Sequence, residues 1–442
     1  MPSEVGKNLL RDLERDLAGL RARDELRSFA QVAGVNLCSN DYLGLAEDPR
    51  LKEATLEAVS ASPRMGGTGS RLLSGHDAVW DGLEEEFAAY ARTEAALYFA
   101  NGYAANIALL SSVAGRNDLV FSDELNHASL IDGIRLSRAR KEIFPHRDLN
   151  ALEAALRFHE RESCRKLIVT ESVFSMDGDV ADVKTMQSLA KRYGANLVVD
   201  EAHATAVHGP SGSGIAAEAG LANEVFALVH TCGKALAGAG AFVCGARVLR
   251  EFLINHARTL IFSTAMPPYM AGQIRAALGL ARGMDSERRR LRENSLTLAA
   301  GLGSWTDDRP VLRTTAESPE ALRRDMALLS AQGKRGEMAE RAVASASDGH
   351  RRVPGAAKRT SQIVPVVIGS NEDALAAAAY LRGQGFAVRA IRPPTVPAGT
   401  ARLRLSLTAR ITREHVTDIL GALQNWRRLQ SSLTAAEVAG RV

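Results

Sequence analysis

Short apolar runs alternate with longer stretches of helical periodicity between about Ser39 and Met266. Leu167–Val169 and Leu197–Val199 are runs of the first kind, and 182–193 is a stretch of the second kind. Continuous apolar strands separated by helices are typical of a parallel sheet that is covered on both faces. The pattern therefore predicts an α/β domain.

A stripe of leucines precedes this region at helical spacing. It predicts an amphipathic helix whose apolar face must be buried against something. The stripe consists of Leu9, Leu10, Leu13, Leu17 and Leu20.

The pattern changes again beyond residue 280. Residues 304–360 are rich in Arg, Ala, Ser and Asp, which predicts a helical insertion or a partly disordered segment. After it come apolar runs and helical stretches that predict a second, smaller α+β domain: a strand at 363–368, a helix at 373–384, strands at 386–389 and 402–407, and a last helix at 412–429. We therefore divide the chain into an N-terminal helix and segment (1–44), a large domain (45–285) and a small domain (286–442) with an insertion near 304–360.

Composition excludes several classes of protein. Lys and Arg total 55 against 51 Asp and Glu, and a net charge of +4 over 442 residues is too weak to indicate nucleic acid or a membrane surface. The four cysteines are far apart, so neither a disulfide framework nor a zinc site is indicated. No apolar run approaches the roughly 20 residues that span a bilayer, and no signal peptide is evident. We expect a cytoplasmic protein with no nucleic-acid or membrane partner.

The most informative chemistry lies at the end of one apolar run. Asp200 and His203 directly follow Leu197–Val199, and Lys234 lies further along in a glycine-rich stretch. Pyridoxal 5'-phosphate needs an anion at its pyridine nitrogen, a hydrogen-bond partner at its phenolic oxygen and an amine for its aldehyde, and these three side chains supply them. Each also has an ordinary structural interpretation, since Asp200 can form a turn, His203 can lie in the core and Lys234 can be solvated.

Other candidates are less specific. The run 101–103 precedes a helical stretch and can offer backbone N–H groups to a phosphate, or it can be a simple turn. The glycine-rich run 66–70 can be structural or can face a cofactor, and neither run has the Gly-x-Gly-x-x-Gly spacing of a dinucleotide site. His127 can stack on a pyridine ring or cap the next helix. Arg404, between two leucines on a strand, can bind a carboxylate or be a surface charge.

Five runs resemble the α-oxoamine synthases, a family of fold-type I pyridoxal-phosphate enzymes. The runs are SNDYLGL at 39–45, TESVFSMDGD at 170–179, DEAH at 200–203, GKAL at 233–236 and RPPTVPAGT at 392–400. The last run is most similar to the oxononanoate-synthase branch of the family. The resemblance implies an aspartate-aminotransferase-like fold with a mainly parallel seven-stranded sheet and a smaller α+β domain. It also implies pyridoxal 5'-phosphate as cofactor and a homodimer with shared active sites.

The resemblance implies a role for individual residues. Lys234 resembles the Schiff-base lysine, Asp200 the pyridine partner, His203 the phenolic-oxygen partner and His127 the stacking ring. The remaining positions divide into two groups. The cofactor-binding group is Gly102, Tyr103, Ser175 and Thr231, with Ser263 or Thr264 reaching the phosphate of the partner subunit; the substrate-binding group is Arg27 near the entrance, Asn40, Thr395 and Arg404 at the amino-acid carboxylate. The insertion and a short segment between Arg27 and Leu37 depart from the family and affect the acyl entrance.

The implied reaction is the decarboxylative condensation of L-alanine with a pimeloyl thioester, carried by CoA or a carrier protein, to 8-amino-7-oxononanoate in biotin biosynthesis. Three alternatives stay open at this point. They are a glycine-using synthase such as 2-amino-3-oxobutyrate CoA ligase, a non-catalytic scaffold subunit and an aminotransferase.

Overall fold

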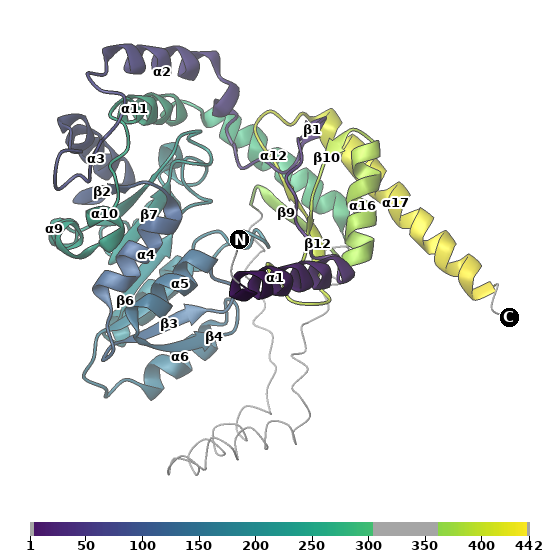
Figure 1. The fold of residues 1–442 in the computed structure, drawn as a ribbon, viewed down its shortest axis with the longest axis horizontal. Helices are drawn as coiled ribbons and strands as arrows, with labels where there is room; N and C mark the ends of the chain where they lie inside the picture. The colour runs from purple at the N-terminus through teal and green to yellow at the C-terminus, as the bar shows by residue number, and fades with distance from the viewer. Residues whose placement is uncertain (1–3, 304–360, 440–442) are drawn as a thin grey trace, which may run out of the picture. The chain divides into compact units, whose positions relative to one another are not determined.

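A seven-stranded, mainly parallel sheet forms the centre of the large domain in the computed structural model, which describes residues 4–303 and 361–439 (Figure 1). Only β8 runs antiparallel to its neighbours β2 and β7; every other neighbouring pair is parallel. The order across the sheet is β2 (Ala95–Phe99), β8 (Ala241–Gly245), β7 (Ala227–Thr231), β6 (Asn196–Asp200), β5 (Lys166–Glu171), β3 (Leu119–Asp123) and β4 (Arg140–Phe144). The sequence-based prediction of an α/β domain is confirmed.

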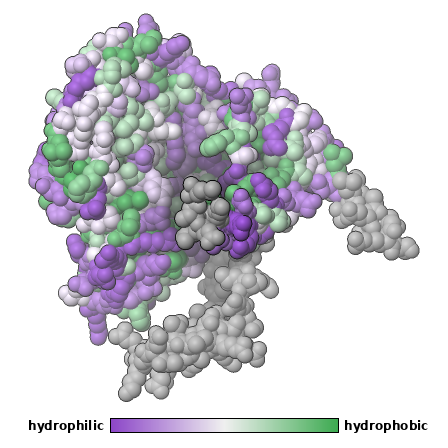
Figure 2. Space-filling model, in the orientation of Figure 1, coloured by the Kyte–Doolittle hydropathy of each residue, from purple (hydrophilic) through white to green (hydrophobic). Residues whose placement is uncertain are grey.

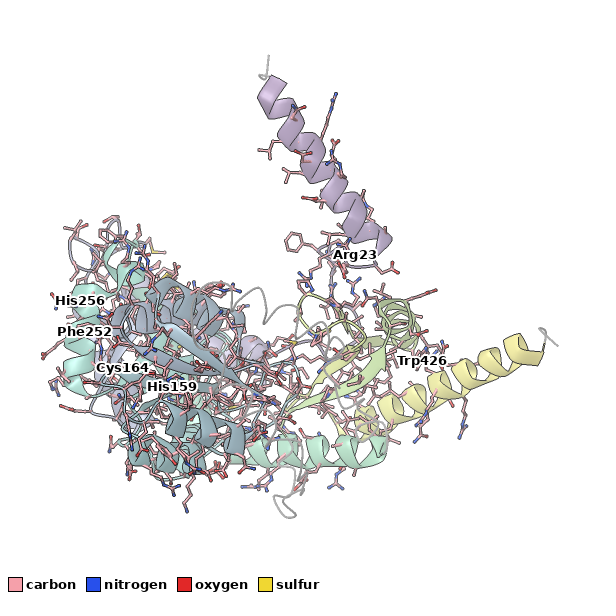
Figure 3. The ribbon with its side chains drawn as sticks, turned by 90° about the horizontal axis from the view of Figure 1, so that it is seen from below. Arg23, His159, Cys164, Phe252, His256 and Trp426 are labelled. Atoms are coloured by element: carbon pink, nitrogen blue, oxygen red, sulfur yellow. The ribbon has the colours of Figure 1, made fainter. Side chains whose placement is uncertain are left out.

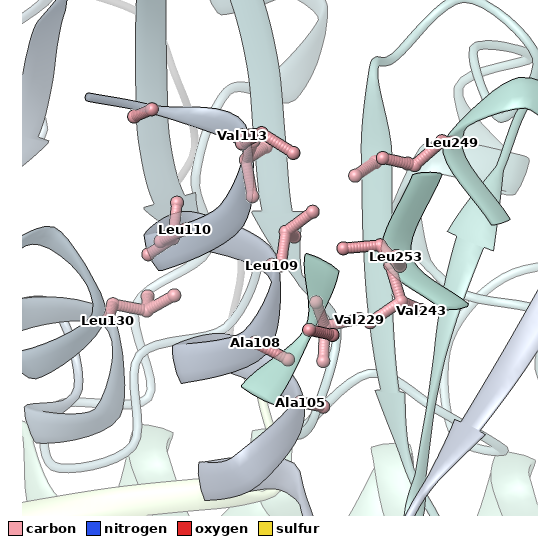
Figure 4. Close-up of a cluster of buried hydrophobic side chains, with 14 of the residues drawn as sticks. Ala105, Ala108, Leu109, Leu110, Val113, Leu130, Val229, Val243, Leu249 and Leu253 are labelled. Carbon is pink, nitrogen blue, oxygen red and sulfur yellow. The ribbon is translucent and has the colours of Figure 1, made fainter. Parts of the chain in front are cut away.

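Helices cover both faces of this sheet. On one face, α4 (Gly102–Val113), α5 (Ala128–Ser137), α9 (Arg247–His256) and α10 (Arg258–Ile261) pack on the strands. Figure 4 shows the apolar cluster between them, in which Leu109, Leu249 and Leu253 meet Val229 and Val243. Each fully buried leucine contributes roughly 1.5–3 kcal/mol, so this layer stabilises the packing of these helices on the sheet.

The opposite face is covered by α3 (Ala78–Ala91), whose Phe87 stacks on Phe242 of β8 with ring centroids 3.9 Å apart. Acidic caps start many of the surrounding helices, because a carboxylate satisfies backbone N–H groups that the first turn leaves free. Asp48, Asp77, Asp148 and Asp182 act in this way. The remaining elements up to residue 302 are η1 (Leu45–Glu47), α2 (Pro49–Ala61), α6 (Leu149–Phe158), α7 (Val183–Arg192), η2 (Pro210–Gly212), α8 (Ile215–Glu218), α11 (Tyr269–Arg282) and α12 (Asp285–Leu302).

The small domain has the predicted first strand and both predicted helices, but three strands lie between the helices where two were predicted: the predicted strand 386–389 forms only at 386–387, and a further short strand lies at 390–391. A three-stranded antiparallel sheet has β12 in its centre, and a two-stranded parallel sheet joins β1 to β10. Its elements are β1 (Val35–Asn36), β9 (Ile363–Gly369), α16 (Asn371–Gly383), β10 (Phe386–Ala387), β11 (Ala390–Ile391), β12 (Ala401–Ser406) and α17 (Arg413–Ala439).

The predicted domain limits at 44 and 285 stay predictions. The described residues up to Gly301 and from Ser361 onward belong to one compact unit. The predicted insertion at 304–360 lies outside the described residues.

The predicted N-terminal helix is present as α1 (Glu4–Ala22), but its leucine stripe is not buried as expected. Leu9, Leu10, Leu13 and Leu17 are 44–61% exposed. The chain is fastened just after the helix, where Asn371 donates to the Arg23 carbonyl at 2.9 Å and Arg392 donates to the Asp24 carbonyl. Figure 3 shows Arg23 at that end of α1. Within the described residues of this chain, the apolar face of α1 therefore stays exposed.

Hydrophilic and hydrophobic residues are intermixed on the face shown in Figure 2. Among the described helices, none is long and apolar enough to cross a membrane.

Candidate active site

The carboxyl ends of three neighbouring strands bring acidic and hydroxyl side chains to one edge of the large sheet. Glu171 ends β5, Asp200 ends β6 directly opposite it, and Thr231 ends β7. β2 ends at the same edge and leads into α4, whose first residue is Gly102. Ligands bind at this edge in open α/β sheets because the loops that leave the strands surround it.

Asp200 is a buried carboxylate with a fixed orientation. Its Oδ1 accepts from the Ala202 N–H at 2.8 Å and its Oδ2 accepts from Asn106 Nδ2 at 2.7 Å. The side chain therefore has a partner on each oxygen while no cation forms an ion pair with it among the described residues. A buried anion held in this way can bind a protonated ring nitrogen.

Asn106 connects Asp200 to His127 through one further hydroxyl. Asn106 Nδ2 also donates to Ser129 Oγ at 2.8 Å, and Ser129 Oγ lies 2.7 Å from His127 Nδ1. The His127 side chain caps α5 by accepting from the Ser129 N–H, so the capping interpretation is correct. Burial lowers the pKa of His127, an effect that Asp200 opposes and Lys234 assists, so the ring is held neutral beside Asp200.

Lys234 lies on the loop that follows β7. The Cys232 N–H donates to the Gly240 carbonyl at 2.9 Å, which closes the loop. Gly240 has a φ of +92° and lies against the Tyr98 ring, so a side chain does not fit there. Burial lowers the pKa of Lys234, while Asp200 and Glu171 oppose that shift. An amine with a lowered pKa is available as a nucleophile or a base.

His203 lies directly in front of that amine. Its Nε2 is 3.0 Å from Lys234 Nζ and its Nδ1 is 2.6 Å from the Tyr42 hydroxyl. Burial lowers the pKa of His203 well below its usual value, with Lys234, Arg404 and His127 adding to the effect. Gln362 Nε2 donates to the His203 carbonyl at 2.6 Å, which fixes the backbone that carries the ring.

The N-terminus of α4 carries the backbone N–H groups of Gly102 and Tyr103. A Cβ added to Gly102 would lie 2.6 Å from Thr231 Cγ2, so only glycine brings these N–H groups beside the threonine. Tyr103 offers the next backbone N–H, while its hydroxyl points to Asp132. Free N–H groups at a helix N-terminus and a nearby hydroxyl are typical of a phosphate site.

Arg404 is buried on the central strand β12 and is not a surface charge. Its Nη2 donates to Asn40 Oδ1 at 3.1 Å, and its Nε donates to the Ser175 carbonyl. The structure thus brings two predicted substrate-binding residues, Arg404 and Asn40, together with Ser175 of the predicted cofactor-binding group. A guanidinium fixed at this place has the geometry to bind a carboxylate.

Two further pairs of predicted residues lie at the surface. Arg27 Nη2 donates to Thr395 Oγ1 at 2.9 Å, so these two positions are also in contact. Ser263 and Thr264 are exposed in the segment after α10. The next residue, Ala265, donates its N–H to the Gly69 carbonyl at 2.8 Å, which ties the glycine-rich run 66–70 to this segment.

Several site residues were not singled out from the sequence. Asn106, Ser129, Gln362 and Tyr42 contact the predicted residues, and of these only Tyr42 lies within a motif that resembles the family. Glu171 lies in another such motif and is fully buried, and its Oε1 has no hydrogen-bond partner in the described chain. Burial and the neighbouring Asp200 raise the pKa of Glu171 to about 8, so it carries a proton near neutral pH.

Other parts of the molecule offer less chemistry. The described residues contain no cluster of three or more metal-ligating side chains. A hollow of about 690 Å³ lies at the opposite edge of the sheet, near Leu167 and Asn196 at the starts of β5 and β6, and is lined mainly by apolar side chains such as Val113, Leu249 and Phe252. The strand-end site is therefore the candidate active site.

Fold and site together define an aspartate-aminotransferase-like protein with a lysine, a buried acid and a neutral imidazole at one sheet edge. Residues 32–316 match the family model of class I and II aminotransferases. An 8-amino-7-oxononanoate synthase from Burkholderia thailandensis is 42% identical over 91% of this chain and 94% of its own length. One from Geobacter sulfurreducens is 41% identical with the same coverage.

A solved structure is also similar. It is a serine palmitoyltransferase from S. paucimobilis with a bound PLP–myriocin aldimine, 26% identical, with a TM-score of 0.76 over 95% of this chain and 97% of that one. The chain belongs to the class I and II aminotransferase family and, within it, to the 8-amino-7-oxononanoate synthases.

Proposed function

We propose that this protein is a pyridoxal-phosphate-dependent acyltransferase that condenses L-alanine with a pimeloyl thioester. The products are 8-amino-7-oxononanoate, carbon dioxide and a free thiol, and the reaction serves biotin biosynthesis. The observation that carries the proposal is the meeting of Lys234, His203 and Asp200 at one sheet edge, in a chain 42% identical to a synthase of that name.

The residues present fit pyridoxal 5'-phosphate. The space beside Thr231 that a Cβ on Gly102 would fill suits the phosphate, and Thr231 offers a hydroxyl to it. When bound, the cofactor supplies an aldehyde for an amine and a ring that accepts the electron pair released at the substrate Cα. Asp200 would hold the proton on the ring nitrogen, and its fixed orientation supports that role.

Lys234 has two tasks in this proposal. Its amine would hold the aldehyde before substrate arrives, and after alanine displaces it the same amine would take the Cα proton. Both tasks need an unprotonated amine, and the burial that lowers the pKa of Lys234 favours that form. His203 would bind the phenolic oxygen, and His127 would lie against the ring face.

Arg404 would bind the alanine carboxylate through two parallel hydrogen bonds, which orients the substrate. Its anchoring by Asn40 and Ser175 supports this role, because it leaves the guanidinium little freedom to turn. Arg27 and Thr395 would contact the acyl chain. Ser263 and Thr264 are exposed, in accord with a contact to a second subunit, and we propose a homodimer that can be tested by light scattering.

A product assay tests the function directly. We expect mass spectrometry to find 8-amino-7-oxononanoate from alanine and pimeloyl-CoA, or from the pimeloyl carrier protein, at a higher rate than any product from glycine and acetyl-CoA. Lys234→Ala should abolish the product, whereas Lys191→Ala, which changes an exposed lysine paired with Glu224, should not.

Three other outcomes would contradict the proposal. Faster turnover of glycine with acetyl-CoA would indicate a glycine-using synthase. A colourless protein without product would indicate a scaffold subunit. Conversion of the cofactor to its amine form by an amino donor alone would indicate an aminotransferase.

A further inference from the structure

A continuous line of polar contacts runs from Lys234 to Arg404. Lys234 Nζ is 3.0 Å from His203 Nε2, and His203 Nδ1 is 2.6 Å from the Tyr42 hydroxyl. The Tyr42 hydroxyl is in turn 3.1 Å from Asn40 Oδ1, which is 3.1 Å from Arg404 Nη2. Of these residues, Tyr42 alone has no role in the proposed reaction.

The imidazole in this line has two different nitrogens. His203 is buried and neutral, and a neutral imidazole carries one N–H donor and one bare acceptor. The hydrogen bond made at Nδ1 therefore decides what Nε2 presents to the group in front of it.

The Tyr42 hydroxyl has one proton and two possible acceptors, His203 Nδ1 and Asn40 Oδ1. The contact with His203 Nδ1 is the shorter, at 2.6 Å against 3.1 Å to Asn40 Oδ1. The Asn40 oxygen already accepts from Arg404, and Ser406 Oγ also donates to it at 3.4 Å. These contacts favour a hydroxyl proton that points to His203, with Nδ1 as its acceptor and the ring hydrogen on Nε2.

We propose that Tyr42 is a positioning residue that holds His203 in the tautomer with hydrogen on Nε2. In the structure that hydrogen faces the Lys234 amine; with cofactor bound it would face the phenolic oxygen. The inference rests on the proposed function, because a donor at Nε2 matters only if an anionic oxygen is placed there.

Burial makes this control effective. Tyr42 has no exposed surface and His203 is 4% exposed, so water does not replace a lost partner. Without the hydroxyl, the ring is free to carry its hydrogen on Nδ1, and Nε2 would then turn a lone pair toward a negatively charged oxygen. That arrangement is unfavourable, because it removes a hydrogen bond to a charged group and adds repulsion.

The variant Tyr42→Phe tests the proposal, because it removes only the hydroxyl. The readout is the pH midpoint of the yellow absorbance of the protein loaded with pyridoxal 5'-phosphate. At low pH the Lys234 nitrogen bonded to the cofactor carries a hydrogen that the phenolic oxygen accepts, and at high pH that hydrogen is lost. A donor from the protein stabilises the phenolic oxygen most when this partner is gone, so it favours the high-pH form. We expect the midpoint to rise by about one pH unit in Tyr42→Phe, which corresponds to one hydrogen bond to a charged group.

Matched variants separate positioning from a general loss of packing. Tyr90→Phe makes the same change at another buried tyrosine, whose hydroxyl donates to the Gly212 carbonyl, and should leave the midpoint unchanged. In a His203→Asn background, adding Tyr42→Phe should produce no further shift, because the effect passes through the imidazole. A second readout uses the cofactor-free protein: ¹⁵N NMR should find the His203 hydrogen on Nε2 in the wild type and a mixture of tautomers in Tyr42→Phe.

The outcomes distinguish this inference from the proposed function. A wild type that binds no cofactor at Lys234 overturns the function. A yellow wild type whose midpoint is unchanged by Tyr42→Phe overturns the inference alone. So does a shift of equal size in the His203→Asn background, or a wild-type His203 with hydrogen on Nδ1.

Discussion

The two ends of the candidate site are built in different ways. The cofactor end (Asp200, His203, Lys234 and His127) comes from strand ends and loops of the one large sheet, and its supports Asn106 and Ser129 are buried. The substrate end (Arg27, Asn40, Thr395 and Arg404) combines the first 40 residues with the small domain, and two of its members are exposed. In the proposed reaction, the cofactor-binding side chains are therefore positioned by one sheet, whereas the proposed substrate-binding side chains depend on contacts between segments that are far apart in the chain.

The largest expected effect is at the buried anion of the cofactor end. Asp200→Asn keeps the shape of the side chain and one of its two acceptor oxygens, removes the charge, and puts an NH₂ donor in place of the other oxygen. We expect kcat to fall on the order of 10²–10³-fold, because a neutral amide does not hold the proton of the ring nitrogen. The measurement is kcat at saturating alanine, per bound cofactor. Asp182→Asn, which keeps a cap on α7, should retain full activity, and an Asp200→Asn enzyme at half the normal rate would contradict the assigned role.

His146 connects the end of β3 to the turn that follows β5. Its Nδ1 contacts Asp123 at 2.9 Å and its Nε2 contacts Asp179 at 3.3 Å, in the turn that also carries Ser175. Burial lowers the pKa of His146, but the hydrogen bonds of the two carboxylates outweigh it and raise the pKa to about 9. The folded state therefore binds the proton more tightly than the unfolded state, which stabilises it by about 3 kcal/mol at low pH.

This stabilisation has a defined pH window. It is fully present below the ordinary histidine pKa near 6.5 and is lost as pH rises from there through about 9. His146→Gln should therefore lower the free energy of unfolding most at pH 6 and little above pH 9, as measured by denaturant titration. His76→Gln, which breaks an exposed pair with Asp81, should change it by less than about 1 kcal/mol at any pH. A His146→Gln deficit that is constant with pH would contradict the paired imidazolium.

Arg404 tests the substrate end at its most buried point. Arg404→Lys keeps the charge but loses the fork that makes two parallel bonds. We expect the KM for alanine to rise roughly 10–100-fold with a smaller change in kcat. Arg402→Lys is the matched control, since Arg402 is buried on the same strand but pairs with Asp177 at 2.6 Å. An unchanged apparent affinity for alanine in Arg404→Lys would rule out the carboxylate role.

The same contrast explains what the sequence predicts and what it does not. The apolar runs predict the large sheet, and Asp200 and His203 were singled out because they directly follow such a run. Both signals can be read from neighbouring residues of the sequence. Asn106 was missed because it lies inside an apolar helix, and its contact with Asp200 joins residues 94 positions apart. The position of Arg404 between two leucines left a surface charge open, and only the structure shows its burial, since every residue of β12 is buried in the centre of its sheet. The leucine stripe of α1 predicted the helix but not its exposure.

The smallest expected effect is at the contact between Arg27 and Thr395. Both side chains are exposed, so the 2.9 Å hydrogen bond contributes only about 0.5 kcal/mol. Thr395→Val removes the hydroxyl at constant shape and should raise the KM for the pimeloyl thioester about two- to threefold, with kcat and the KM for alanine unchanged. Thr395→Ser keeps the hydroxyl and should behave as the wild type. If Thr395→Val instead raised the KM for alanine, the contact between Arg27 and Thr395 would also position the buried alanine-binding residues. The proposed separation between the cofactor end and the substrate end would then fail.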